Sequence, residues 1–342
     1  MELNDFTARL KSGAIGGVFA FVGEEEYLKR YYLSRLRAAA VEDPTLATFN
    51  HLVFDGEDMD FGALTDAIKA PPMMSDYKMV EWRYADFASM SEKELAAVEE
   101  LCSLQAEHSY TTMAFIISDG DADLGTDKHP GKFLKRFGKI MNILRFDKST
   151  DNQLYSWLKK HFDAEGVGVS LDTLKAMVFR CGHSMDVLIN EVRKLSALAK
   201  SRGLEAITPE HVEEVCASTP ECDTFAFSNA IIDRNRKAAF LALEEMKLRR
   251  VDPITVTSMM IRTYSDLVSV ALLLDEGMGA QDISDTLKMN SYKLKIYAAA
   301  AKKHTADRLV AVQKKLAQMD VSSKYGGVSG YTAIELFVSK YL

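Results

Sequence analysis

The first 147 residues alternate between short apolar segments and amphipathic ones, and this alternation constrains the fold more than any other feature. The apolar segments are β-rich and bounded by turn residues, as strands are. They occupy residues 18–22, 51–56, 78–83, 111–118 and 142–147. The helices expected between them cover about residues 24–40, 60–70 and 91–104. Strands that alternate with helices predict a mostly parallel sheet with helices on both faces.

After Asp147 the pattern predicts helices and no further strand. Four short helices come first, punctuated by Ser, Thr or Asp at their starts and by Gly at their ends. The fourth has Thr208 as N-cap and Pro209 at the first helical position, where a missing N–H costs nothing. The segment STPECDT at 218–224 has the composition of a linker.

From Phe225 to the end the pattern is wholly helical. The expected helices cover about residues 225–233, 236–248, 253–275, 280–287, 291–301, 306–319 and 329–340. The chain of 342 residues is long enough for two or three domains. We therefore expect an α/β domain over 1–147, a small helical domain over 148–217 and a larger helical domain over 218–342.

Composition indicates an ordinary globular protein of a reducing compartment. The formal net charge of −7 argues against a protein that coats nucleic acid on its own. No signal peptide or apolar run of about 20 residues is visible. The cysteines are scattered without a CxxC pair, which fits the cytoplasm and offers neither a disulfide framework nor a metal knuckle. They are Cys102, Cys181, Cys216 and Cys222.

The first strand–turn–helix, FVGEEEYLKR, stands where a nucleotide-binding domain would hold phosphate. A phosphate loop needs glycines, inward backbone N–H groups, a lysine and a Ser or Thr. Here Gly23 is followed by Glu24, Glu25 and Glu26, whose carboxylates would repel a triphosphate. Lys29 is not placed as GK[ST] would place it. A structural helix start is favoured over an ATP site.

No other pattern predicts catalysis. DGDADLG at 119–125 opens like a calcium loop but has Leu124 where glycine is needed and Pro130 where the closing glutamate belongs. Neither HExxH nor GxSxG occurs. We expect no catalytic residue, no cofactor and no bound metal.

The segment APPMMSDY at 70–77 places two methionines on an exposed turn. Pro71 and Pro72 precede Met73 and Met74, and polar turn residues follow. The methionines either fold back on their own domain or form an adaptable apolar plug for another protein's pocket. The pattern alone leaves both interpretations open.

Basic residues gather in the C-terminal helices, with tyrosines between them. They are Lys288, Lys293, Lys295, Lys302, Lys303, Arg308, Lys314, Lys315 and Lys324, with Tyr292, Tyr297 and Tyr325 interleaved. The set is either a solvated helix face or a surface that lies near a phosphate backbone, where a tyrosine can stack on a base.

Taken in order, these segments resemble the delta subunit family of the bacterial DNA polymerase III clamp loader. The resemblance covers essentially the whole chain. It includes a Glu-x-x-Lys-Leu pattern at Glu191, Lys194 and Leu195. The other segments that carry it are FVGEEEYLKRYYLSRL, PPMMSDYKMVEW, KFLKRFGKIMNILRFDKSTDNQLYSWLKKHFDAEGVGVS and LAQMDVSSKYGG.

The resemblance implies an AAA+-like domain with a degenerate phosphate loop, a small helical lid and a C-terminal helical collar. Such a subunit does not hydrolyse ATP; it binds and opens the sliding clamp beside ATPase and delta-prime subunits in a hetero-pentamer. Met73 and Met74 occupy the positions of the family's clamp-binding apolar pair, commonly Leu-Phe, from which Met-Met departs.

The resemblance also implies contact with primed DNA. Tyr325 falls in the family's turn near the primer–template end, and Lys324, Tyr292 and Lys293 are further possible contacts. Two alternatives stay open: a nucleotide-binding AAA+-type ATPase of DNA metabolism, and a regulator whose helices read DNA. Neither alternative explains the methionine loop.

Overall fold

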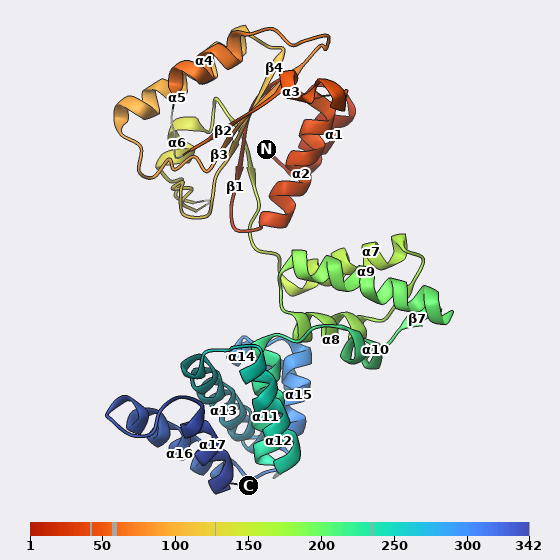
Figure 1. Ribbon diagram of the computed structural model, residues 1–342, viewed down its shortest axis with the longest axis vertical. Helices are drawn as coiled ribbons and strands as arrows, with labels where there is room; N and C mark the ends of the chain where they lie inside the picture. The colour runs from red at the N-terminus through yellow and green to blue at the C-terminus, as the bar shows by residue number, and fades with distance from the viewer. Residues whose placement is uncertain (42, 57–59, 127, 234, 342) are drawn as a thin grey trace. The chain divides into compact units, whose positions relative to one another are not determined.

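The computed structural model describes residues 1–41, 43–56, 60–126, 128–233 and 235–341. The chain forms two compact units, Met1–Ser149 and Thr150–Leu342. Figure 1 shows the sheet in the first unit and the helices of the second. The further division of the helical region near residue 217 stays a prediction.

The first unit contains the expected parallel sheet. Its strands are β1 (Gly17–Val22), β2 (His51–Asp55), β3 (Lys78–Arg83), β4 (Thr111–Ile116) and β5 (Asn142–Arg145). All neighbouring strands are parallel, in the order β2-β3-β4-β1-β5. All five predicted strands are therefore confirmed, although β2, β4 and β5 end one or two residues earlier than expected.

Helices cover both faces of this sheet. They are α1 (Leu3–Lys11), α2 (Glu26–Ala40), α3 (Ala47–Asn50), α4 (Phe61–Lys69), α5 (Glu92–Glu107) and α6 (Lys132–Phe137), with a 3₁₀ turn η1 (Pro44–Leu46). Val18 and Val22 of β1 join a core with side chains of α4, α5 and α6. Phe19 and Phe21 point the other way and pack edge-on against Phe6 of α1. Residues of one strand alternate between two cores because strand side chains have a period of two.

A buried carboxylate joins α2 to the strands at one side of the sheet. Glu81 of β3 is fully buried and accepts hydrogen bonds from Arg37 of α2 and from Arg83, and one of its oxygens lies 2.7 Å from Nε2 of His51 on β2. Burial raises the pKa of Glu81, but the hydrogen bonds and charges of His51 and Arg37 outweigh it and lower that pKa to about 2. Glu81 is therefore ionised in the folded protein at neutral pH.

The second unit is helical, with one small addition. Its helices are α7 (Asp151–Ala164), α8 (Leu171–Cys181), α9 (Met185–Arg202), α10 (Pro209–Val215), α11 (Pro220–Ile232), α12 (Arg236–Leu248), α13 (Pro253–Asp275), α14 (Ala280–Leu287), α15 (Ser291–Ala301), α16 (Ala306–Lys324) and α17 (Gly330–Tyr341). Thr208 and Pro209 begin α10 as expected. The prediction of no further strand was wrong, because β6 (Gly168–Val169) pairs in parallel with β7 (Ala206–Ile207).

Two predicted boundaries also change. Residues 218–224 are not all linker, because Thr219 caps α11 by accepting a hydrogen bond from the Cys222 amide, with Pro220 at the first helical position. Helix α16 does not end at residue 319 but continues to Lys324.

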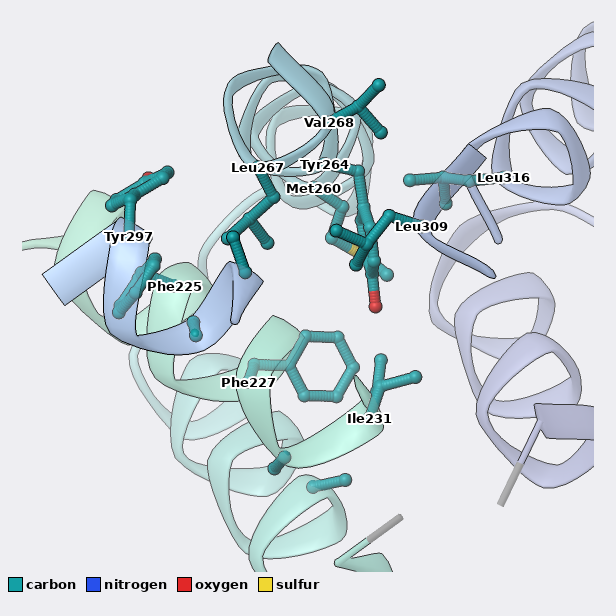
Figure 2. Close-up of a cluster of buried hydrophobic side chains, with 14 of the residues drawn as sticks. Phe225, Phe227, Ile231, Met260, Tyr264, Leu267, Val268, Tyr297, Leu309 and Leu316 are labelled. Carbon is teal, nitrogen blue, oxygen red and sulfur yellow. The ribbon is translucent and has the colours of Figure 1, made fainter. Parts of the chain in front are cut away.

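Helix α13 lies at the centre of the C-terminal core (Figure 2). Its Tyr264 side chain is buried among apolar residues, and its hydroxyl donates to the carbonyl of Ser228 on α11 at 3.3 Å. The rings of Phe225 and Tyr297 stack with centroids 4.4 Å apart, which joins α11 to α15. Although α13 has 23 residues, no helix in the described part of the chain has both the length and the apolar character needed to cross a membrane.

Candidate functional site

The turn after β1 packs closely against the backbone of Phe146, so it does not form an open phosphate-binding loop. Gly23 has φ +110°, and a Cβ at this position would lie 2.4 Å from the carbonyl oxygen of Phe146. Only glycine fits such a close approach. The single glycine of the turn is therefore explained by packing.

The polar groups of this turn are used within the protein. The amide of Glu25 donates to the carbonyl of Phe146 at 2.9 Å. Lys29 is buried; its Nζ donates to the carbonyl of Ile117 at 3.0 Å and lies 2.6 Å from a carboxylate oxygen of Glu26. An amide, a lysine and a helix start that could have bound phosphate already have protein partners, which disfavours the ATPase alternative.

The methionine loop connects α4 to β3 and exposes its apolar side chains. Met73 is 43% exposed and Met74 is 87% exposed. Met74 also has φ +49°, in the left-handed region that costs a non-glycine residue roughly 1–2 kcal/mol. Backbone strain of this kind occurs at binding sites, where the surrounding structure enforces it.

Asn50 fixes the backbone of this loop. Its side chain is only 1% exposed; Nδ2 donates to the carbonyl of Met73 at 2.8 Å, and Oδ1 accepts from the amide of Met73 at 2.7 Å. One carboxamide thus satisfies both backbone groups of Met73, as a neighbouring strand would. Both groups are held in place while the Met73 and Met74 side chains remain outside.

The helix that leads into the loop has its last carbonyls fully paired. Helix ends leave four carbonyls without helical partners, and side chains from the starts of β3 and β4 supply the donors here. Lys78 Nζ donates to the carbonyls of Ala67 and Ala70, Tyr110 to that of Lys69 at 2.6 Å, and Thr111 to that of Ile68 at 3.0 Å. Burial lowers the pKa of Lys78 to about 8. The end of α4, from which the loop begins, is therefore fixed by hydrogen bonds.

The possible DNA contacts fall in two separate places. Tyr325 follows α16 and is 86% exposed, next to Lys324, which pairs with Asp320 at 2.7 Å. At the start of α15 the ring of Tyr292 packs against Phe179. Lys293, beside it, lies 3.4 Å from a carboxylate oxygen of Asp266 and is mostly covered. Tyr325 is open to a ligand, whereas Lys324, Tyr292 and Lys293 each have a partner within the protein.

Sequence reasoning missed the residues that position the loop. Asn50 and Met73 are 23 residues apart, so no local pattern links them. Lys78 did leave a signal, because a lysine at the start of a buried strand needs a partner.

Comparisons with known proteins point in one direction. The family model described as "DNA polymerase III, delta subunit" matches residues 19–136, and the "DNA polymerase III delta subunit, C-terminal domain" model matches residues 221–341. The DNA polymerase III subunit delta of Bacillus subtilis (strain 168) is 23% identical over 344 residues, covering 99% of this chain and 96% of that protein. The "Probable DNA polymerase III subunit delta" of Aquifex aeolicus (strain VF5) is 22% identical, covering 90% and 86%.

A solved structure shares the fold. The Bacillus subtilis DNA clamp loader delta protein aligns with a TM-score of 0.57 at 20% identity, covering 99% of this chain and 98% of that one. The alignment spans the α/β unit and the helical region together.

Proposed function

The chain belongs to the DNA polymerase III delta subunit family, and on that premise we propose that it binds a sliding clamp through Met73 and Met74 and opens the ring for loading onto primed DNA. A clamp loader delta subunit is a non-catalytic accessory subunit of the polymerase. The contact between Met73–Met74 and the clamp is the part of the proposal that needs testing.

One observation supports it most: two adjacent apolar side chains are exposed on a loop whose backbone is fixed by hydrogen bonds from Asn50. Exposed apolar side chains on a rigidly presented loop are typical of a partner-binding site. Methionine suits this role because its unbranched thioether adapts to the shape of a pocket.

The free energy gained by burying the two methionines is enough for a hot spot but not for a whole interface. Burying two methionine side chains supplies on the order of 3–6 kcal/mol before ordering costs. The bonds from Asn50 to Met73 reduce those costs, since the loop is already ordered before binding. Opening then follows if the open ring fits the delta surface better than the closed ring does.

The remaining roles follow from the same premise. We place the chain in the cytoplasm, in a hetero-pentamer with ATPase and delta-prime subunits. Residues 1–147 would bind the clamp, 148–217 would form the lid, and 218–342 would join the collar. Tyr325 is the best-placed DNA contact because it is largely exposed, whereas Lys324, Tyr292 and Lys293 already have partners within the protein.

The test is equilibrium binding of the whole chain to the cognate clamp, comparing wild type with Met73→Ala/Met74→Ala. We expect at least a hundredfold weaker binding, equivalent to about 2.7 kcal/mol. Circular dichroism should show an unchanged fold, because both side chains contact solvent.

A matched control is Leu248→Ala, which removes a side chain that is 80% exposed on the C-terminal helices. It should leave clamp affinity unchanged. Equal loss in both variants, or full binding by the double variant, would place the contact elsewhere.

A further inference from the structure

A cluster of metal-ligand types lies in the small helical region, away from the methionine loop. Cys181 ends α8, Glu191 lies in α9, and Cys216 follows α10. The two Sγ atoms and a carboxylate oxygen all lie within 4.8 Å of one another, and all three residues are buried. Helices α8, α9 and α10 pack against one another there (Figure 1).

The backbone around this cluster is fixed. Arg180 donates from Nε to the carbonyl of Cys216 at 2.8 Å, and its own carbonyl accepts from the amide of Thr219, also at 2.8 Å. These two bonds hold the chain after α10 against the end of α8. The ligand atoms are therefore brought together before any ion binds.

A buried carboxylate between two thiols lacks strong hydrogen-bond donors unless a further partner binds it. The cation beside Glu191 is Lys194, whose Nζ lies 2.7 Å from Oε2 and whose side chain is half exposed. Thiols are weak hydrogen-bond donors and satisfy a carboxylate incompletely.

Sulfur and carboxylate ligands together select a borderline-soft ion. Zinc takes Cys sulfur at about 2.3 Å and carboxylate oxygen at about 2.0–2.2 Å, in tetrahedral geometry. Ligands at those lengths are separated by about 3.5–4 Å, which is compatible with ligand atoms that lie within 4.8 Å of one another. Calcium and magnesium prefer oxygen ligands alone and fit this set poorly.

We propose that Cys181, Glu191 and Cys216 form a structural zinc site that joins α8, α9 and the segment after α10. Each cysteine binds as thiolate, so its proton passes to the buffer when the ion enters. Lys194 then acts as an outer partner that orients the carboxylate.

Cys222, the remaining cysteine of this region, is not one of the three clustered ligands. It lies at the start of α11 and is less buried than the other two cysteines. A water molecule would complete the tetrahedral coordination.

The experiment uses the full chain, stripped of metal and kept reduced by a phosphine. Zn²⁺ is titrated in competition with a chromophoric chelator, and Co²⁺ is added separately as a spectroscopic probe. We expect one ion per chain, a thiolate-to-cobalt charge-transfer band, and a higher melting temperature with Zn²⁺. Cys181→Ser/Cys216→Ser should weaken Zn²⁺ binding about a hundredfold or more, and Glu191→Gln about tenfold or more.

The matched control is Cys102→Ser, which alters a buried cysteine of the other unit and should leave binding unchanged. If the double variant does not fold, the wild-type cobalt spectrum decides alone, because thiolate ligation produces the charge-transfer band. No stoichiometric uptake by wild type, or equal loss in Cys102→Ser, would overturn the proposal. None of these outcomes depends on clamp binding.

Discussion

The two turns at opposite ends of the N-terminal strands are both rigid, but they present different groups to solvent. The turn after β1 lies at the carboxyl ends of the strands, where α/β proteins usually bind ligands, and its polar groups bond to Phe146 and Ile117. The loop before β3 lies at the amino ends and leaves Met73 and Met74 outside. The difference teaches that a loop's chemistry, rather than its place in the fold, decides whether it can bind a partner.

The largest effect is expected from Gly23→Ala. The new Cβ would lie 2.4 Å from the Phe146 oxygen, in a backbone region that already disfavours side chains. We expect a loss of more than about 3 kcal/mol in unfolding free energy. Chemical denaturation followed by the fluorescence of Trp82, in a Trp157→Phe background, measures it.

Gly13→Ala is the matched control for that substitution. Gly13 has φ +73°, but a Cβ added there would meet nothing within 4 Å, so only the backbone cost remains. Equal losses of unfolding free energy in the two variants would show that the close contact with Phe146 adds nothing to the cost at Gly23.

The charge network around Glu81 should make the first unit sensitive to acid. The folded pKa of Glu81, about 2, lies below its ordinary 4.5, so the stabilisation is complete above pH 4.5 and is lost as pH falls toward 2. The shift corresponds to roughly 3 kcal/mol. Glu81→Gln should be less stable at pH 7 and should lose less between pH 4.5 and 2, as measured by urea unfolding across that range.

The matched comparison is Glu92→Gln, which removes an exposed carboxylate that also pairs with an arginine, Arg136. Surface pairs contribute about 0–1 kcal/mol. If the unfolding free energy of Glu81→Gln depends on pH as that of wild type does, the charge network around Glu81 does not contribute to stability.

Met74→Asn separates the loop's side chain from its backbone. Asparagine tolerates the left-handed conformation at φ +49°, so the unfolding free energy should change by less than about 0.5 kcal/mol. Clamp affinity should fall at least about tenfold, because the apolar contact is lost. Met74→Leu, which keeps the apolar volume, should retain most of the affinity.

The smallest effect on clamp affinity is expected from Asn50→Ala, which leaves the side chains of Met73 and Met74 unchanged. Loss of two hydrogen bonds should cost about 1–2 kcal/mol of stability and lower clamp affinity up to about tenfold, through a slower or less favourable ordering of the loop. Isothermal titration should show a larger entropic penalty. Unchanged affinity would show that clamp binding does not need the hydrogen bonds from Asn50.

Sequence predicted the sheet because its strands are buried apolar runs bounded by turn residues. It missed α6, whose six residues are too few to show a helical period, and β6–β7, whose two-residue strands show no period at all. It misplaced the start of α11 because Thr219-Pro220 fits a linker by composition as well as it fits an N-cap and first helical position.

At the candidate site, the exposed pair could be identified from the sequence, whereas its support could not. Turn chemistry around Met73 and Met74 is local and therefore visible in the sequence. The bonds from Asn50, Tyr110 and Thr111 join residues 23 to 43 positions apart, and only folding brings them together.

The pairing at the end of α4 has a mechanical consequence. Tension applied to Met74 would pass through Met73 into Asn50 and β2, and through the last turn of α4 into β3 and β4. Three parallel strands would share the pull, so the loop would stretch little before the sheet itself resisted. A loop anchored in this way can carry load without changing its own conformation.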